Sequence, residues 1–124
     1  MNDNRRVQSY RDLIVWQKSI ELVKNVYCLI RNFPKFETYG LSDQLRRSSV
    51  SVPSNIAEGQ ARQHTGEFRQ FLYISLGSIA EVDTQIIIAE QLNYISDLEA
   101  KDIQKLIIEI QKMLRKLIVR LPNH

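Results

Sequence analysis

The most constraining feature of the chain is the segment 39–59, which is built almost wholly from small residues and carries a proline in its interior. From Ser42 to Ala61, twenty residues make about 30 Å of helix at 1.5 Å per residue. Pro53 either breaks this segment into two short helices or kinks one long helix. An unbroken helix matches the length of the helix predicted before it, so the two pack along their whole length. We therefore predict one helix that is kinked at Pro53.

Asn55 and Glu58 follow this proline closely. Polar side chains near a proline kink need hydrogen-bond partners wherever they are buried. We expect both to bond backbone groups that the kink frees, and we expect neither to be catalytic.

Three further segments show apolar side chains at spacings of three and four, which is typical of one helix face. Helices are predicted over residues 12–32, 65–93 and 97–121, and proline ends the first at Phe33-Pro34. The expected core positions are Leu13, Trp16, Ile20, Val23, Tyr27 and Ile30 in the first helix, Phe68, Phe71, Leu72, Ser75, Ile79, Val82, Ile86 and Ala89 in the next, and Ile103, Leu106, Ile110, Met113, Leu117 and Leu121 in the last. The apolar face is widened by Val15, Leu22, Val26 and Leu29 in the first helix and by Ile107, Leu114 and Ile118 in the last.

Four helices joined by short connections predict an all-α, antiparallel up-down-up-down four-helix bundle. No strand pattern competes with this interpretation, and only four glycines and three prolines are present. The bundle is expected to form a single domain over residues 1–124, with residues 1–10 as a flexible arm.

Several local signals mark helix ends and contacts. Ser42 and Thr65 are predicted as N-caps, and Ser96 with Glu99 has the spacing of a capping box. Gly77 costs about 1 kcal/mol relative to alanine inside a helix, which predicts a close helix contact there.

The apolar surface exceeds what one bundle core requires. Neighbouring residues on a helix lie about 100° apart, so the run Ile86-Ile87-Ile88-Ala89 cannot face a single core. A second buried surface is needed, and we expect it to be an interface between copies of the chain.

The sequence contains none of the catalytic or metal-binding motifs with a known mechanism. No glutamate is followed three residues later by histidine, which disfavours the di-iron site of ferritin-like bundles. His64 falls in a turn, His124 is terminal, and Cys28 is expected to be a small core residue. We expect no enzyme activity, no cofactor and no metal site.

Cellular location is suggested by three features of the sequence. No apolar run reaches the length of about 18 residues that a membrane span needs. The N-terminal residues lack the apolar core of a signal peptide, and the single cysteine excludes an internal disulfide. We therefore expect a cytoplasmic protein without a membrane partner.

Charge is unevenly distributed along the chain. The formal net charge is +3, which divides into +4 for residues 1–75, −5 for residues 76–109 and +4 for residues 110–124. This segregation either makes one face attractive to polyanions or complements the helix dipoles.

Arg46 and Arg47 allow two interpretations. Arginine side chains suit phosphate oxygens, so the pair is a candidate nucleic-acid contact. Alternatively, Arg47 pairs with Asp43 four residues earlier, and Arg46 reaches Glu81 or Glu90 on a neighbouring helix.

A second basic cluster lies at the end of the last helix. It has four cations in nine residues and no acid, which exceeds what the helix dipole requires. The cluster is either a contact for nucleic acid or an acidic partner, or a solvated face. Its members are Lys112, Arg115, Lys116 and Arg120, with Arg5, Arg6 and Arg11 as a further basic arm.

Several spaced motifs over residues 10–95 resemble one known family. They are Tyr10-Arg11-Asp12-Leu13-Ile14-Val15-Trp16-Gln17-Lys18, Tyr39-Gly40-Leu41, Gln44-Leu45-Arg46-Arg47, Val52-Pro53-Ser54-Asn55-Ile56-Ala57-Glu58-Gly59, Glu67-Phe68, Phe71-Leu72, Leu76-Gly77-Ser78 and Glu81. The chain resembles the small four-helix-bundle proteins encoded in intervening sequences of bacterial large-subunit ribosomal RNA genes, some of which are labelled ribosomal proteins. It is also similar to accessory proteins of diversity-generating retroelements, which associate with a reverse transcriptase and nucleic acid. The resemblance implies a homopentameric ring.

The predicted function is therefore a non-enzymatic, homo-oligomeric bundle, pentameric by the resemblance, that binds structured RNA or DNA through basic surface. The predicted contact residues are Arg46, Arg47, Arg62, Arg115 and Lys116. The alternative is an interaction scaffold or accessory subunit with a protein partner, because the acidic segment 76–109 repels nucleic acid.

Overall fold

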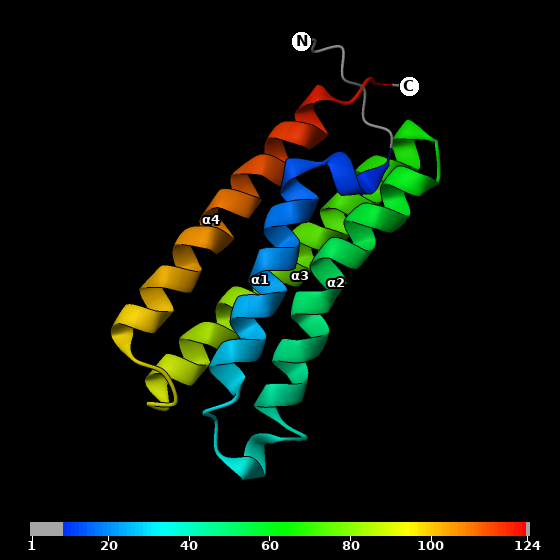
Figure 1. The fold of residues 1–124 in the computed structure, drawn as a ribbon. Coiled ribbons are helices and arrows are strands. Elements are labelled where there is room, and N and C mark those ends of the chain that lie inside the picture. Colours follow the sequence, from blue (N-terminus) through cyan, green and yellow to red (C-terminus); the bar gives the residue numbers. More distant parts are fainter. Residues whose placement is uncertain (1–8, 124) are drawn as a thin grey trace.

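The computed structural model describes residues 9–123, and Figure 1 shows their arrangement. Four long helices follow one another along the chain, with a short 3-10 helix before α1 and another before α2. Their bounds are η1 Tyr10–Asp12, α1 Ile14–Ile30, η2 Lys35–Glu37, α2 Leu41–Ala61, α3 Thr65–Gln91 and α4 Asp97–Arg120. No strand occurs among the described residues, which confirms the prediction of an all-α protein with four helices.

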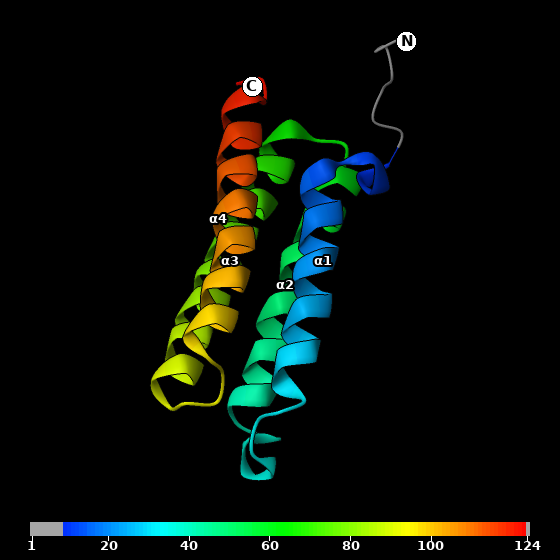
Figure 2. The same ribbon diagram turned by 60° about the vertical axis from the view of Figure 1, so that its left-hand side comes forward.

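The helices lie side by side as a four-membered bundle. In Figure 1 the chain descends along α1, rises along α2, descends along α3 and rises along α4, and Figure 2 shows the same helices turned by 60°. Each helix packs against two others, in the pairs α1–α2, α2–α3, α3–α4 and α1–α4, while the described residues make no diagonal pairs. The start of α1 and the end of α4 therefore lie at one end of the bundle, and η2 lies at the opposite end.

The core differs from the prediction in the centre of the face that α1 presents. Leu22 and Val26, predicted at the edge of this face, are completely buried, whereas the predicted central positions Ile20 and Tyr27 are 36% and 41% exposed. The centre of the predicted stripe was therefore wrong by part of a turn, because both sides of this helix are apolar and only packing selects one. In α3 and α4 most predicted positions are buried or packed against the core, as expected.

Small side chains let α2 and α3 approach closely. Gly59 is buried, and a Cβ atom at this position would lie 2.6 Å from Cβ of Phe71 on α3. Hydroxyl groups line the same contact: Ser75 donates to the Val52 carbonyl at 3.0 Å, and Ser51 bonds Ser78 at 2.8 Å. The small-residue segment thus packs as its composition indicates.

Gly77 does not make the predicted close contact, because a Cβ there would meet nothing within 4 Å and the residue is exposed. Cys28 was also predicted wrongly as a core residue, since it is exposed on α1 and lines an open groove with Glu99 and Asp102 of α4. Residue type alone does not reveal whether a helix position is buried.

α2 continues through Pro53 without a break, as predicted, and the bend at Pro53 stays a prediction. The amide of Asn55 donates to the carbonyl and to the hydroxyl of Ser51, at 2.8 and 2.9 Å. The carbonyl that Pro53 leaves without its helix donor is that of Ser49, so Asn55 does not bond the freed group that was predicted. Nor does Glu58, whose carboxylate instead accepts a hydrogen bond from Arg62.

The helix caps are partly as predicted. The capping box of Ser96 and Glu99 is present. Thr65 is the first residue of α3 rather than its N-cap, and Ser42 lies inside α2. The N-cap of α2 is Gly40, and the backbone N–H of Leu41 donates to the Glu37 carboxylate at 2.9 Å. An acid from the preceding connection therefore caps the helix in place of the serine.

α3 is long and apolar enough to cross a membrane by length and composition, which the count of uninterrupted apolar residues did not indicate. Its buried side chains include Leu72, Ile79, Val82 and Ile86, which form the bundle core. Burial in the bundle covers 39% of its apolar stretch, so core packing accounts for part of the apolar content of this helix.

Glu37 also joins the two connections at this end of the bundle, because its second carboxylate oxygen accepts a hydrogen bond of 2.8 Å from the Tyr94 hydroxyl. Hydrogen bonds from the Leu41 backbone N–H and from Tyr94 lower the pKa of Glu37 below its ordinary value. A lowered pKa in the folded state stabilises the fold above the ordinary pKa, and this stabilisation is lost as pH falls through the folded value.

We therefore expect Glu37→Gln to lower the urea midpoint more at about pH 7 than at about pH 3, relative to the unsubstituted protein at each pH. Equal differences at the two pH values would show that the charge of Glu37 does not contribute to the cap.

Candidate nucleic-acid interface

The C-terminal half of α4 carries the largest group of uncompensated cations. Lys112, Lys116 and Arg120 are four residues apart, which places them on one face with about 6 Å of helix rise between neighbours. Arg115 lies beside them, and all four side chains are exposed. Between residues 9 and 123, none of the four makes an ion pair or a hydrogen bond through its side chain. We call these four residues the α4 cation stripe.

The stripe borders an open groove between α1 and α4. Lys116 and Arg120 line this groove together with apolar residues and with no carboxylate. The apolar residues are Leu13, Ile14, Val15, Met113 and Leu117. An anionic ligand that approaches this side of α4 therefore meets positive charge without a competing acid.

The end of α4 is held by a contact from another helix. The guanidinium of Arg69 on α3 donates to the backbone carbonyls of Leu121 and Pro122, at 3.1 and 2.8 Å. These carbonyls follow the last turn and lack partners within the helix. Arg69 is therefore occupied in positioning the stripe and is not part of it.

Arg62 lies at the same end of the bundle, but its charge is compensated. Its guanidinium lies 2.8 Å from the Glu58 carboxylate and 3.6 Å from that of Glu67, and it stacks over the Phe71 ring at 5.2 Å. The hydrogen bond to Glu58 raises the pKa of Arg62 above its ordinary value. These contacts make Arg62 a link between the end of α2 and the start of α3.

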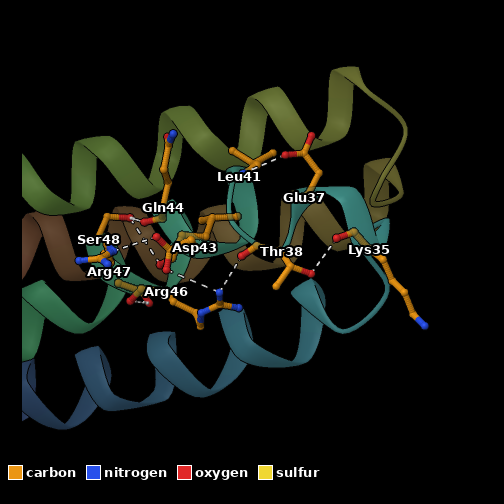
Figure 3. Close-up of polar contacts among 11 residues, drawn as sticks. Lys35, Glu37, Thr38, Leu41, Asp43, Gln44, Arg46, Arg47 and Ser48 are labelled. Carbon is orange, nitrogen blue, oxygen red and sulfur yellow. Dashed lines mark hydrogen bonds and ion pairs between the residues drawn. The ribbon is translucent and has the colours of Figure 1, made fainter.

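Arg46 and Arg47 share one acid at the opposite end of the bundle, as Figure 3 shows. Asp43 lies 2.9 Å from Arg47 and 3.6 Å from Arg46, and the hydrogen bond from Arg47 lowers the pKa of the Asp43 carboxyl. Arg46 also donates to the Thr38 carbonyl at 2.9 Å. The predicted pairing of Arg47 with Asp43 is confirmed.

The predicted pairing of Arg46 with Glu81 or Glu90 is wrong, because Asp43 and the Thr38 carbonyl lie closer along its own helix and connection. The side chain of Arg47 remains 79% exposed and can still reach an external anion.

The five predicted contact residues do not form one patch. Arg46 and Arg62 are separated by sixteen residues of α2, or about 24 Å along the helix axis. Arg115 and Lys116 lie at the end of the bundle that holds Arg62, and only these two lack a protein partner in the described part of the chain. Lys112 and Arg120 complete their surface, and the signal for them was the absence of acid among residues 110–124.

Among residues 9–123, no group of three or more His, Cys, Asp or Glu side chains that could hold a metal ion occurs. His64 is exposed at the N-cap of α3. His124, Arg5 and Arg6 lie outside the described residues, and Arg11 is exposed in η1.

The fold and this surface together define a class: a small four-helix bundle with a basic helix end and a small-residue second helix. Residues 11–116 match the family model described as 23S rRNA-intervening sequence protein. Because this match spans most of the chain, the protein belongs to that family, which confirms the resemblance predicted from the sequence.

A solved structure supports the assignment. A protein of unknown function from the S23 ribosomal protein family of Bacteroides thetaiotaomicron VPI-5482 superimposes with a TM-score of 0.76 at 26% sequence identity. The alignment covers 85% of this chain and 98% of that protein. A search of curated proteins found no significant match. Neither the family description nor the description of the solved structure indicates a catalytic activity.

Proposed function

We propose that this protein is a non-enzymatic, homo-oligomeric RNA-binding bundle of the cytoplasm, and that the α4 cation stripe is its phosphate contact. The observation that carries the proposal is the stripe itself, four exposed cations without a carboxylate partner in residues 9–123. Uncompensated cations on one helix face suit a nucleic-acid backbone, which attracts Lys and Arg independently of base sequence.

The names of similar proteins support RNA in particular. The family description refers to 23S rRNA, and the similar solved protein is assigned to a ribosomal protein family. The proposed binding requires no specific RNA sequence, because phosphate contacts carry no sequence information.

Self-association would strengthen such a contact. Exposed apolar side chains occur along the outer face of α3, including Tyr73, Ile74, Ile87 and Ile88 at 41–56% exposure. An oligomer that covers this face would bring several stripes together, and a pentamer of chains at +3 each would carry about +15. Multivalent contact raises avidity without a new type of interaction.

The test is a fluorescence-anisotropy titration of the full chain with a structured RNA and with a DNA duplex, at about 50 and about 200 mM salt. We expect binding to the RNA that weakens steeply as salt rises. Absence of binding at the lower salt would overturn the proposal. A monomeric mass by light scattering at micromolar concentration would overturn its oligomeric part.

A second candidate function is a scaffold for a protein partner, and the exposed apolar face of α3 favours it. This face lies on a helix with acidic residues such as Glu81 and Asp83, which repel nucleic acid. A partner that remains bound after nuclease treatment, and is lost when Ile74 and Ile88 are replaced by serine, would support the scaffold.

A further inference from the structure

The connection between α1 and α2 presents two aromatic rings to solvent. Phe36 is 78% exposed and Tyr39 is 94% exposed, although both belong to a connection of only ten residues. We call residues 31–40 the aromatic loop. It includes η2 and lies at the end of the bundle opposite to the α4 cation stripe (Figure 1).

The loop is held by its own hydrogen bonds. The Thr38 hydroxyl donates to the Lys35 carbonyl at 2.8 Å, and the Gly40 N–H donates to the Glu37 carbonyl at 2.9 Å. From α2, Arg46 donates to the Thr38 carbonyl, as Figure 3 shows. A connection bonded in this way holds its backbone in place before a ligand arrives, which lowers the entropy cost of binding.

Two further aromatic rings, Phe33 and Tyr94, form a row with Phe36 and support it on one side. The ring centroid of buried Phe33 lies 5.2 Å from that of Tyr94, and Tyr94 lies 6.5 Å from Phe36 in an edge arrangement. The Tyr94 hydroxyl is bonded to Glu37, so the middle ring of the row is fixed from the α3–α4 connection. Phe36 is therefore braced on one side and open to solvent over most of its surface.

Cations outnumber acids in the aromatic loop and the start of α2. Residues 31–47 hold the four cations Arg31, Lys35, Arg46 and Arg47 and the two carboxylates Glu37 and Asp43. Arg31 and Lys35 are exposed, and within the described residues neither side chain has an ion-pair partner. Figure 3 shows the Lys35 side chain extending away from the helices. Both carboxylates are engaged by protein groups.

We propose, on the basis of the RNA-binding function above, that the aromatic loop binds unpaired nucleotides. Bases stack on Phe36 and Tyr39, and Arg31 and Lys35 contact the adjoining phosphates. Exposed aromatic rings among cations are the usual surface for single-stranded nucleic acid, because every base has a face that stacks. Duplex RNA keeps its bases stacked internally and cannot make this contact.

The proposal gives the two ends of the bundle different roles. α4 has 24 residues, or about 36 Å of helix, so the α4 cation stripe and the aromatic loop are far apart along the bundle. The stripe meets phosphates of any strand, whereas the loop distinguishes unpaired from paired RNA. A structured RNA with both a stem and an unpaired segment is the class of ligand that uses both.

The experiment compares a fluorescein-labelled RNA of about 12 nucleotides, single-stranded or annealed to its complement, in titrations with the full chain at about 100 mM salt. We expect the double variant Phe36→Ser and Tyr39→Ser to bind the single strand at least about tenfold more weakly, since stacking of two bases is lost. Its binding of the duplex should not change. The double variant Phe36→Tyr and Tyr39→Phe, which keeps both rings, should bind the single strand like the unsubstituted protein.

Ile108→Ser serves as the control, because Ile108 is an exposed apolar side chain on α4 that belongs neither to the aromatic loop, nor to the α4 cation stripe, nor to the apolar face of α3. The proposal is overturned if the serine double variant binds the single strand normally, or if Ile108→Ser weakens this binding equally. It is also overturned if the serine double variant lowers the mass measured by light scattering, since the rings would then belong to an interface between copies. If the stripe variants lose duplex binding while the serine double variant binds the single strand normally, the loop proposal fails and the proposed function stands. If the unsubstituted protein binds neither RNA, the proposed function itself fails.

Discussion

Replacing Gly59 by valine is expected to lower the free energy of unfolding by about 3 kcal/mol, as an overpacked helix contact. A Cβ at this position would lie 2.6 Å from Cβ of Phe71 and 3.1 Å from a ring carbon of Phe68. Cβ of Phe71 is attached directly to the backbone of α3, so it cannot yield without moving that helix. The measurement is urea unfolding followed by circular dichroism, with the transition midpoint and slope recorded for both proteins.

Gly77→Val is the matched control, because a Cβ there meets nothing within 4 Å. Valine is a better helix former than glycine by a few tenths of a kcal/mol, so this variant should be as stable as the unsubstituted protein or slightly more stable. Equal destabilisation by the two substitutions would show that the α2–α3 approach at Gly59 is not the close contact that the structure describes.

Removal of the whole α4 cation stripe is expected to weaken RNA binding about 100-fold at about 100 mM salt. The variant replaces Lys112, Arg115, Lys116 and Arg120 by glutamine, which removes each charge but keeps a polar side chain that favours a helix. If each cation contacts one phosphate, the slope of log affinity against log salt should fall by about three to four. The same anisotropy titration measures both quantities, and circular dichroism verifies that the helical content is retained.

A comparison of two double variants tells whether RNA binding depends on the position of the stripe cations or only on the net charge. Arg115→Gln with Lys116→Gln removes two charges from the stripe, whereas Lys24→Gln with Lys105→Gln removes two exposed lysines elsewhere. We expect the first pair to weaken binding and reduce the salt slope by more than the second pair does. Unchanged binding in the first pair would exclude the stripe as the phosphate contact.

Much of the fold was predictable because helix formation is largely local. The spacing of Ile79, Val82 and Ile86 on α3, and the capping box at Ser96, predict features that the structure contains. These signals lie within a few residues of one another, so chain neighbours alone determine them. The continuity of α2 through Pro53 followed from a length comparison between two helices.

The orientation of α1 was not predictable in the same way. Apolar residues occur on both sides of this helix, and local spacing does not distinguish Leu22, which is buried, from Ile20, which is exposed. The choice depends on which side meets α2 and α4. The cap at the start of α2 was missed for a similar reason, because Glu37 reaches Leu41 from a 3-10 helix that the sequence pattern does not mark.

The candidate site shows the same division between local and tertiary information. The charge excess at the end of α4 is visible in the sequence, because no acid occurs among residues 110–124. The compensation of Arg62 is partly local, since Glu58 lies four residues earlier, and partly tertiary, since Glu67 and Phe71 approach it from the next helix. An arginine is available to a phosphate only where the fold leaves it unpaired.

The sequence by itself determined four helices, a close-packed second helix and a basic final segment, because these depend on residues that are near one another in the chain. The tertiary structure alone decided which apolar stripe of α1 is buried, and that Phe36 packs against Tyr94 of the α3–α4 connection while most of its ring stays exposed. These properties arise from contacts between residues far apart in sequence, whose geometry is set by the packing of the helices against each other.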